Sequence, residues 1–192
     1  MISALTDQGP YEFAVSGAGT TTSTWLILTC LWKHRSWLTT ILHFILDTGA
    51  DVGPVNLWMN SLFSDAIVSL NEKLVSPPTS LYPYRAYIET LLSYGPAANE
   101  SQLTGVMWYK DTPGHQDKTT TDNKGFTSRK AFTAQRKSVQ MIGKLHLDLF
   151  CQKKYLLHHV DLKIKLRKSR DVFALLADAD NYKIKIKDLV YL

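Results

Sequence analysis

The sequence predicts a β-rich domain with two short helices in its loops. The clearest evidence lies near the C-terminus, where apolar residues alternate with charged ones over 160–167 and again over 182–187. Such alternation puts every second side chain on one face, as in a half-buried strand. Over residues 83–94 the apolar spacing is helical instead. A length of 192 residues with 45% hydrophobic content suits one domain with a sizeable core.

The first strand is predicted over residues 11–16. Tyr11, Phe13 and Val15 share one face of it, and a Gly- and Thr-rich run ends it.

Residues 24–46 form the most apolar stretch of the chain, so a transmembrane span has to be considered. Lys33, His34 and Arg35 lie at its centre. A charged residue there costs about 2.5–3.5 kcal/mol, more than the flanking leucines and isoleucines recover. We therefore expect this stretch not to cross a membrane.

A short helix, a strand and a turn are predicted between residues 55 and 80. Trp58, Leu62 and Phe63 share one face of the helix, which Pro54 precedes. Residues 66–70 then alternate as a short strand, and Asn71-Glu72 turn the chain. The run Ser-Pro-Pro-Thr-Ser at 76–80 excludes a helix interior.

The second helix is predicted over residues 83–94, with Pro83 in its first turn and Gly95-Pro96 after its end. An apolar stripe runs along it, and Arg85 and Glu89 are spaced for an i, i+4 ion pair. The stripe consists of Tyr84, Tyr87, Ile88, Leu91 and Leu92.

Three further strands are predicted over 139–149, 160–167 and 182–192, and we expect them to be neighbours in an antiparallel sheet. His158-His159 are interpreted as turn residues, because adjacent strand residues point to opposite faces. Phe126–Arg136 fits either a loop or a short helix.

The charge is unevenly distributed along the chain. Residues 1–108 hold 4 Lys or Arg against 8 Asp or Glu, whereas residues 109–192 hold 18 against 9. A basic half raises the alternative of a nucleic-acid-binding β domain. The lysines alternate with apolar residues instead of clustering with aromatic ones, which favours a solvated sheet face. Cys30 and Cys151 form no metal-binding spacing and are interpreted as free thiols of a reducing compartment.

Asp47-Thr48-Gly49 raises a second alternative, because this tripeptide resembles the signature of retroviral-type aspartic proteases. Two such carboxylates share one proton in those enzymes. Met141-Ile142-Gly143-Lys144 is similar to a later word of that family, but the 96 residues from Asp47 to Gly143 exceed its compact subunit and no Gly-rich flap lies between them. We interpret Asp47 as a turn residue and expect no enzyme activity.

Two words of the sequence carry a resemblance to a known family, VGPVNLWMNSLFSDAIVSLN from Val52 and YPYRAYIETLLSYG from Tyr82. They resemble the first jelly roll of the major capsid protein of Polinton/Maverick elements and the related adintoviruses. YEFAVSGAG from Tyr11 and the pattern of residues 128–192 are similar to other strands of that family.

The resemblance implies an antiparallel β-sandwich of the viral jelly-roll type, with residues 1–192 forming a single domain. It implies a structural, non-catalytic subunit that assembles as homotrimers into a capsid, without cofactor, metal or small-molecule substrate. Neither nucleic acid nor a membrane is an expected partner, and the expected location is a virion or the inside of a eukaryotic cell. With no signal peptide at Met1, secretion is not expected. The candidate core and interface residues are Trp58, Leu62, Phe63, Tyr84, Arg85, Tyr87, Ile88 and Leu91.

Two departures from the family pattern lead to further expectations. Residues 24–46 lack the family's alternating strand pair, so we hypothesise that a frameshift or a mis-spliced exon replaced them. The family's protein has two jelly rolls, whereas this sequence stops within the first. We therefore expect the 192-residue product to be poorly soluble and not to form capsids.

Overall fold

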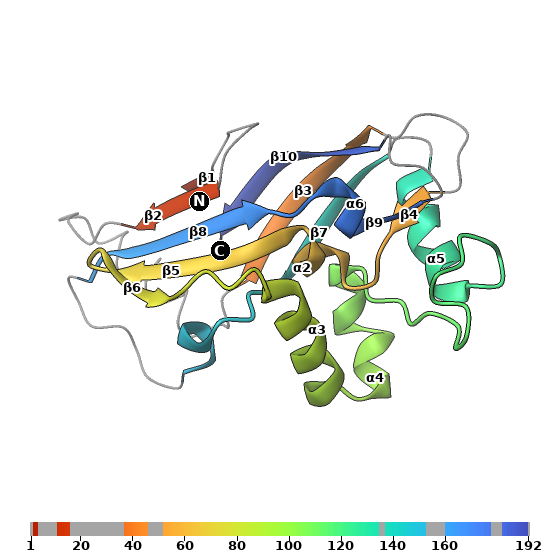
Figure 1. Ribbon diagram of the computed structural model, residues 1–192, viewed down its shortest axis with the longest axis horizontal. Coiled ribbons are helices and arrows are strands. Elements are labelled where there is room, and N and C mark those ends of the chain that lie inside the picture. Colours follow the sequence, from red (N-terminus) through yellow and green to blue (C-terminus); the bar gives the residue numbers. More distant parts are fainter. Residues whose placement is uncertain are drawn as a thin grey trace.

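The structure is a computed structural model that describes residues 2–3, 11–15, 37–45, 52–134, 137–152, 160–177 and 182–191. Its regular structure is mainly antiparallel sheet, as the sequence predicted, with short helices in the connections. Two four-stranded sheets and one two-stranded ribbon are present in these segments. Figure 1 shows the strands running side by side, with α3 and α4 below them and α5 at one end.

The first sheet has the order β1-β10-β3-β7. Its strands are β1 (Ile2–Ser3), β10 (Lys183–Tyr191), β3 (Trp37–Ile45) and β7 (Ser138–Lys144). β3 is central and pairs on one side with β10 and on the other with β7. Residues 37–45 of the stretch that departs from the family pattern therefore form a strand. Lys33, His34 and Arg35 lie outside the described residues.

The second sheet has the order β2-β8-β5-β6. It consists of β2 (Tyr11–Val15), β8 (Leu162–Lys168), β5 (Phe63–Leu70) and β6 (Lys73–Ser76). Asn71 and Glu72, both with positive φ, make the predicted turn between β5 and β6. A separate ribbon joins β4 (Val52–Pro54) to β9 (Leu175–Ala177).

The pairings of these eight sheet strands follow one rule. When they are numbered one to eight along the chain, the first pairs with the last (β1 with β10) and the second with the seventh (β2 with β8). The third likewise pairs with the sixth (β3 with β7) and the fourth with the fifth (β5 with β6). These four pairs are divided alternately between the two sheets. The connectivity is that of one long hairpin whose strand pairs wrap into two sheets.

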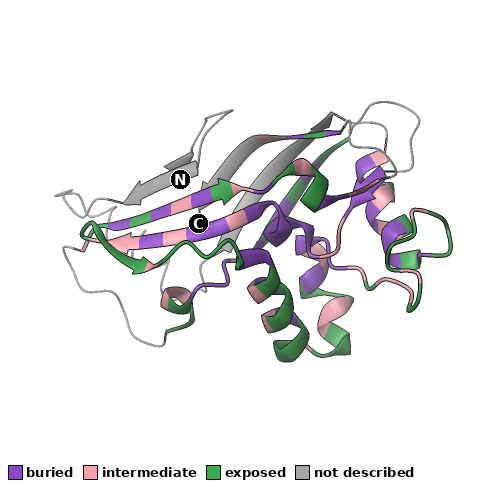
Figure 2. Ribbon diagram, in the orientation of Figure 1, coloured by how far each residue is buried: buried purple, intermediate pink, exposed green. Residues whose placement is uncertain are grey.

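The core lies between the two sheets, as in a sandwich. Met141 of β7 and Ile184 of β10 belong to the same buried cluster as Val68 of β5 and Ile164 of β8. β8 shows the predicted alternation, because its apolar residues are at most 2% exposed while Lys163 and Arg167 are exposed. Figure 2 shows buried positions alternating with exposed or intermediate ones along β8, whereas β5 combines buried and intermediate positions.

Short helices lie in the connections between the strands. They are α2 (Trp58–Ser61), α3 (Tyr82–Ser93), α4 (Pro96–Asn99), α5 (Lys124–Thr133) and α6 (Asp171–Ala174), with 3-10 turns at Gln102–Val106 and Asp148–Cys151. The predicted helix over 83–94 is confirmed as α3. The ambiguous stretch from Phe126 contributes to α5, which Asn123 caps by accepting a hydrogen bond from the Phe126 N–H. None of the helices in the described segments is long and apolar enough to span a membrane.

Two expectations about the strands were wrong. The strands predicted over 139–149, 160–167 and 182–192 are not neighbours: β3 separates β7 from β10, and β8 lies in the other sheet. β7 also ends at Lys144, after which the chain forms an irregular segment and a 3-10 turn. Alternation identifies a strand and its buried face, but the strand's partner depends on tertiary contacts.

The first helix is shorter than the sequence predicted. α2 ends at Ser61, Leu62 is its C-cap, and Phe63 begins β5. Trp58, Leu62 and Phe63 are nevertheless each at most 1% exposed. These three candidates are therefore core residues.

Candidate functional site

α3 packs on the protein through the face opposite its apolar stripe. The face packed on the protein carries Tyr82, Pro83, Ala86 and Thr90, with Ala86 0% exposed. The stripe faces outward, and we call it the apolar face of α3: Tyr84, Tyr87, Ile88, Leu91 and Leu92, which are 40–83% exposed. Small residues let α3 lie close to α2 and β5, while the large ones remain in solvent.

The apolar face continues beyond α3. Leu81, just before the helix, is 58% exposed, and Val172 on α6 is 61% exposed. The rings of Tyr84 and Phe173 meet edge to face, with their centroids 5.8 Å apart. Two segments far apart in sequence thus present one continuous apolar surface. Contiguous exposed apolar patches are common at interaction sites, so this surface is a candidate one.

A polar network behind α3 fixes its orientation. Arg85 forms the predicted ion pair with Glu89, with 2.7 Å between Nε and Oε1, and a second one with Asp148. The other Glu89 oxygen lies 2.8 Å from Nδ1 of the buried His146. The hydroxyl of Tyr82 accepts a weak hydrogen bond from the His146 backbone N–H. α3 is thereby attached to the segment that follows β7.

The pKa values in this network favour an ionised Glu89 and a neutral His146. Burial lowers the pKa of His146 below its ordinary value, although the bond to Glu89 opposes this. Partial burial raises the pKa of Glu89, but hydrogen bonds from Arg85 and His146 outweigh that effect, so the pKa lies below its usual range. Because an ionised carboxylate only accepts hydrogen bonds, Nδ1 of His146 carries the proton between them.

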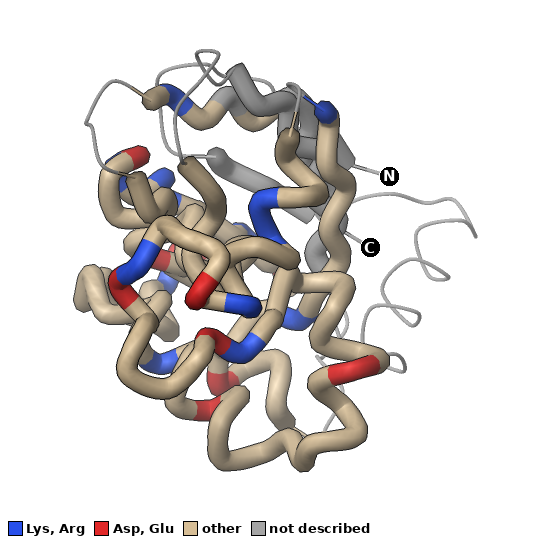
Figure 3. Tube along the Cα trace, turned by 90° about the vertical axis from the view of Figure 1, so that its right-hand side faces the viewer, with Lys and Arg blue, Asp and Glu red and all other residues tan. Residues whose placement is uncertain are grey.

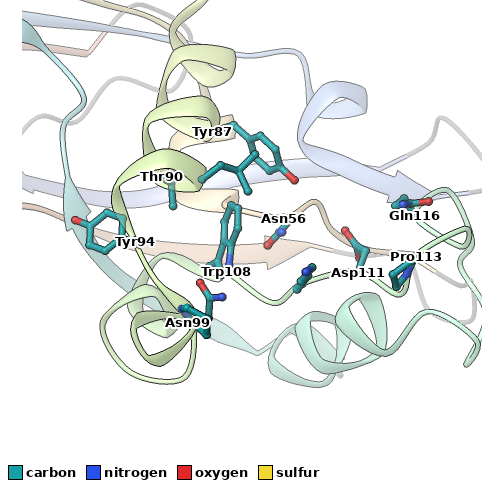
Figure 4. Close-up of a pocket in the computed structure, with 12 residues that line it drawn as sticks. Asn56, Tyr87, Thr90, Tyr94, Asn99, Trp108, Asp111, Pro113 and Gln116 are labelled. Atoms are coloured by element: carbon teal, nitrogen blue, oxygen red, sulfur yellow. The ribbon is translucent and has the colours of Figure 1, made fainter.

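A pocket of about 310 Å³ opens beside the C-terminal half of α3 (Figure 4). Tyr87 and Trp108 form an aromatic wall, with ring centroids 5.2 Å apart. Trp108 is only 3% exposed, and its indole Nε1 has no hydrogen-bond partner among the described residues. The remaining lining residues are Asn56, Thr90, Leu91, Tyr94, Pro96, Asn99, Lys110, Asp111, Pro113 and Gln116.

The side of the pocket opposite α3 is held by a buried arginine. Arg129 of α5, 1% exposed, donates from Nε to the carbonyl of Pro54 at 2.8 Å, from Nη1 to the carbonyl of Tyr109, and from Nη2 to Asp111 at 2.7 Å. A Cβ at Gly125 would lie 2.6 Å from the Tyr109 carbonyl oxygen, so only glycine fits there. The 109–111 segment is therefore clamped between β4 and α5, and the pocket is preformed.

The sequence pointed to two residues of this pocket, Tyr87 and Leu91, as interface candidates, but not to Trp108, Asn56 or the supporting Arg129. Trp108, Asn56 and Arg129 lie on three separate segments, and only the fold brings them together. Asn56 Oδ1 accepts hydrogen bonds from the N–H groups of Leu57 and Tyr109, at 3.1 and 2.9 Å. A single Asn or Trp in a sequence carries no such signal. The pocket had no local motif by which to find it.

The residues behind the alternative functions fall elsewhere. Asp47, Cys30 and His158-His159 lie outside the described residues, whereas Cys151 is exposed and free. Gly143 of the protease-like word lies in β7, where an added Cβ would come within 2.8 Å of Met59 Sδ. That glycine therefore has a packing role. On the side of the molecule drawn in Figure 3, basic and acidic residues are interspersed and do not gather by sign.

No family model matches the chain. The chain is similar to the "Uncharacterized protein F54H12.2" of Caenorhabditis elegans, with 25% identity over 167 residues. The match covers 84% of this chain and 38% of that protein, so the chain spans well under half the length of this relative.

Proposed function

We propose that this chain is a structural subunit, the first jelly roll of a double jelly-roll capsid protein of the Polinton/Maverick type, which self-associates into trimers. The pairing of the eight strands carries the proposal. A jelly roll is a long antiparallel hairpin wrapped into two sheets, and the pairs β1·β10, β2·β8, β3·β7 and β5·β6 follow that scheme. The resemblance of the sequence words that begin at Val52 and Tyr82 to the capsid family supports the same proposal.

The apolar face of α3 supports self-association. Ile88, Leu91 and Leu92 expose 54–83% of their surface, on a helix anchored by ion pairs and packed on the core. Burying a Leu or Ile side chain contributes roughly 1.5–3 kcal/mol, so a subunit that covers several of them gains enough to associate. A rigid helix also loses little entropy when it docks.

Site-specific photo-crosslinking tests the proposal. Replacing Leu92 with a benzophenone amino acid should yield crosslinked dimers and trimers of the full chain on irradiation. The same amino acid at the exposed Asp117, on the polar loop before α5, is the matched control and should yield little product. If position 92 gives no more crosslinking than position 117, α3 does not join copies and the proposal is wrong.

A further inference from the structure

Flat side chains line part of the pocket beside α3. They are those of Tyr87, Tyr94, Trp108 and Pro113. Aromatic-lined grooves are suited to proline-rich extended segments. At about 310 Å³, the pocket is near the low end for small-molecule sites, which suits one or two residues of a peptide.

The protein itself displays such a segment. Pro77, Pro78 and Thr79 are exposed between β6 and α3. Each proline fixes its own φ and restricts the residue before it to extended conformations, so Ser76–Pro78 favour a polyproline II shape.

The end of this segment is tied to the sheet. The N–H and the hydroxyl of Ser80 both donate to the carboxylate of Asp65, which is 1% exposed and is also bonded by Arg167 Nη1 at 3.2 Å. The segment is therefore held in place before any partner arrives, which reduces the entropy cost of binding.

We propose that this pocket binds the Ser76–Leu81 segment of a second copy of the chain, with the prolines of the segment against the rings of Tyr87 and Trp108. Its own segment is excluded. From Tyr82 to Thr90 α3 rises roughly 12 Å, and the bonds from Ser80 to Asp65 hold the segment at the far end of the helix.

The contact joins two different surface sites, and in the proposed trimer it is head-to-tail and closes into a ring. The apolar face of α3 lies between the two sites, so one interface contains all three. This inference rests on the proposed function, since it specifies how the copies of a trimer meet.

A peptide titration tests the pocket alone. The peptide Leu-Val-Ser-Pro-Pro-Thr-Ser-Leu, residues 74–81, is added to the full chain carrying Ile88→Glu and Leu92→Glu, which leave the pocket lining intact. We expect a saturable shift of the Trp108 indole N–H resonance, identified by its loss in Trp108→Phe. A peptide with both prolines replaced by alanine should bind at least tenfold more weakly. No shift at millimolar peptide, or equal binding of both peptides, would overturn the inference.

Mixing two variants tests the contact between copies. Pro77→Ala with Pro78→Ala removes the two prolines of the segment, and Tyr94→Ala removes part of the pocket lining without changing the apolar face of α3, so each variant should associate less than wild type in sedimentation velocity. A 1:1 mixture retains one intact contact and should form dimers. If both variants associate like wild type while Ile88→Glu with Leu92→Glu do not, this inference fails and the proposed function stands. If wild type itself remains monomeric, both fail.

Discussion

Ala86 and Ile88 lie two positions apart on α3 and have opposite surroundings. Ala86 is 0% exposed against the body of the protein, whereas Ile88 is 55% exposed. From hydrophobicity alone, Ile88 would be expected to be buried and Ala86 to be exposed. The helix thus packs closely on the protein at Ala86 and leaves its large apolar residues exposed, as the proposed contact between copies requires.

Because α3 buries Ala86 and exposes Ile88, substitutions at these two positions should change the free energy of unfolding by different amounts. Ala86→Leu should lower the free energy of unfolding by about 1–3 kcal/mol, because extra volume has no room there. Ile88→Ala should change it by no more than about 0.5 kcal/mol, as at other exposed positions. Urea unfolding of dilute protein measures both. Equal costs for the two substitutions would mean that the apolar face is buried within a single copy.

Stability should fall as the pH drops below neutrality. The pKa of His146 is below its ordinary 6.5 in the folded chain, so the unfolded chain binds this proton more readily and acid favours unfolding. The stability that neutral His146 contributes is complete above about pH 6.5 and is lost as the pH falls. Glu89, whose folded pKa lies below the ordinary 4.5, adds a second loss at lower pH.

The His146 contribution can be isolated by substitution. Thermal unfolding at pH 7 and pH 5 should show a smaller loss of stability for His146→Gln than for wild type. An identical loss in both proteins would show that the ring does not titrate as described.

Removing the buried arginine should be among the most damaging single changes. Arg129→Met leaves two buried carbonyl groups and Asp111 without their donor, and breaking a buried ion pair costs roughly 3–5 kcal/mol. Arg129→Lys should recover only part of the loss, since one ammonium group does not reproduce the planar fork of donors. Chemical denaturation measures both variants. A stable Arg129→Met chain would show that α5 does not clamp the 109–111 segment.

The 192-residue chain should not assemble into shells. The apolar face of α3 stays exposed in a single copy, and an exposed apolar patch is an aggregation liability as well as an interaction surface. We expect most of the expressed wild-type chain in the insoluble fraction, and more soluble protein when Ile88 and Leu92 are both changed to glutamate. Negative-stain electron microscopy of the soluble fraction checks the first point. Regular shell-like particles would show that this chain is sufficient for assembly.

The sequence allowed the elements to be predicted better than their arrangement. Alternation identified β8 and its buried face, and Pro83 and Gly95 delimited α3, because both signals are local. The partners of β7, β8 and β10 could not be predicted, since alternation contains no information about neighbours.

For a related reason, the sequence could not predict that the apolar stripe of α3 faces outward. A helix with large residues on one side and small ones on the other usually buries the large ones. Here Ala86 and Thr90 allow a closer approach to the body of the protein. The candidate Arg85 could be paired with Glu89 from spacing alone, whereas its bond to Asp148 and the partnership of Glu89 with His146 depend on the fold.

Sedimentation velocity over a concentration series is the most direct test of the claim that α3 joins copies of this chain. For the soluble wild-type chain, we predict that the weight-average sedimentation coefficient rises with concentration toward that of a trimer. The variant with Ile88→Glu and Leu92→Glu should remain a monomer with unchanged circular dichroism. A wild-type chain that stays monomeric throughout the series, or a variant that associates equally well, would contradict the account.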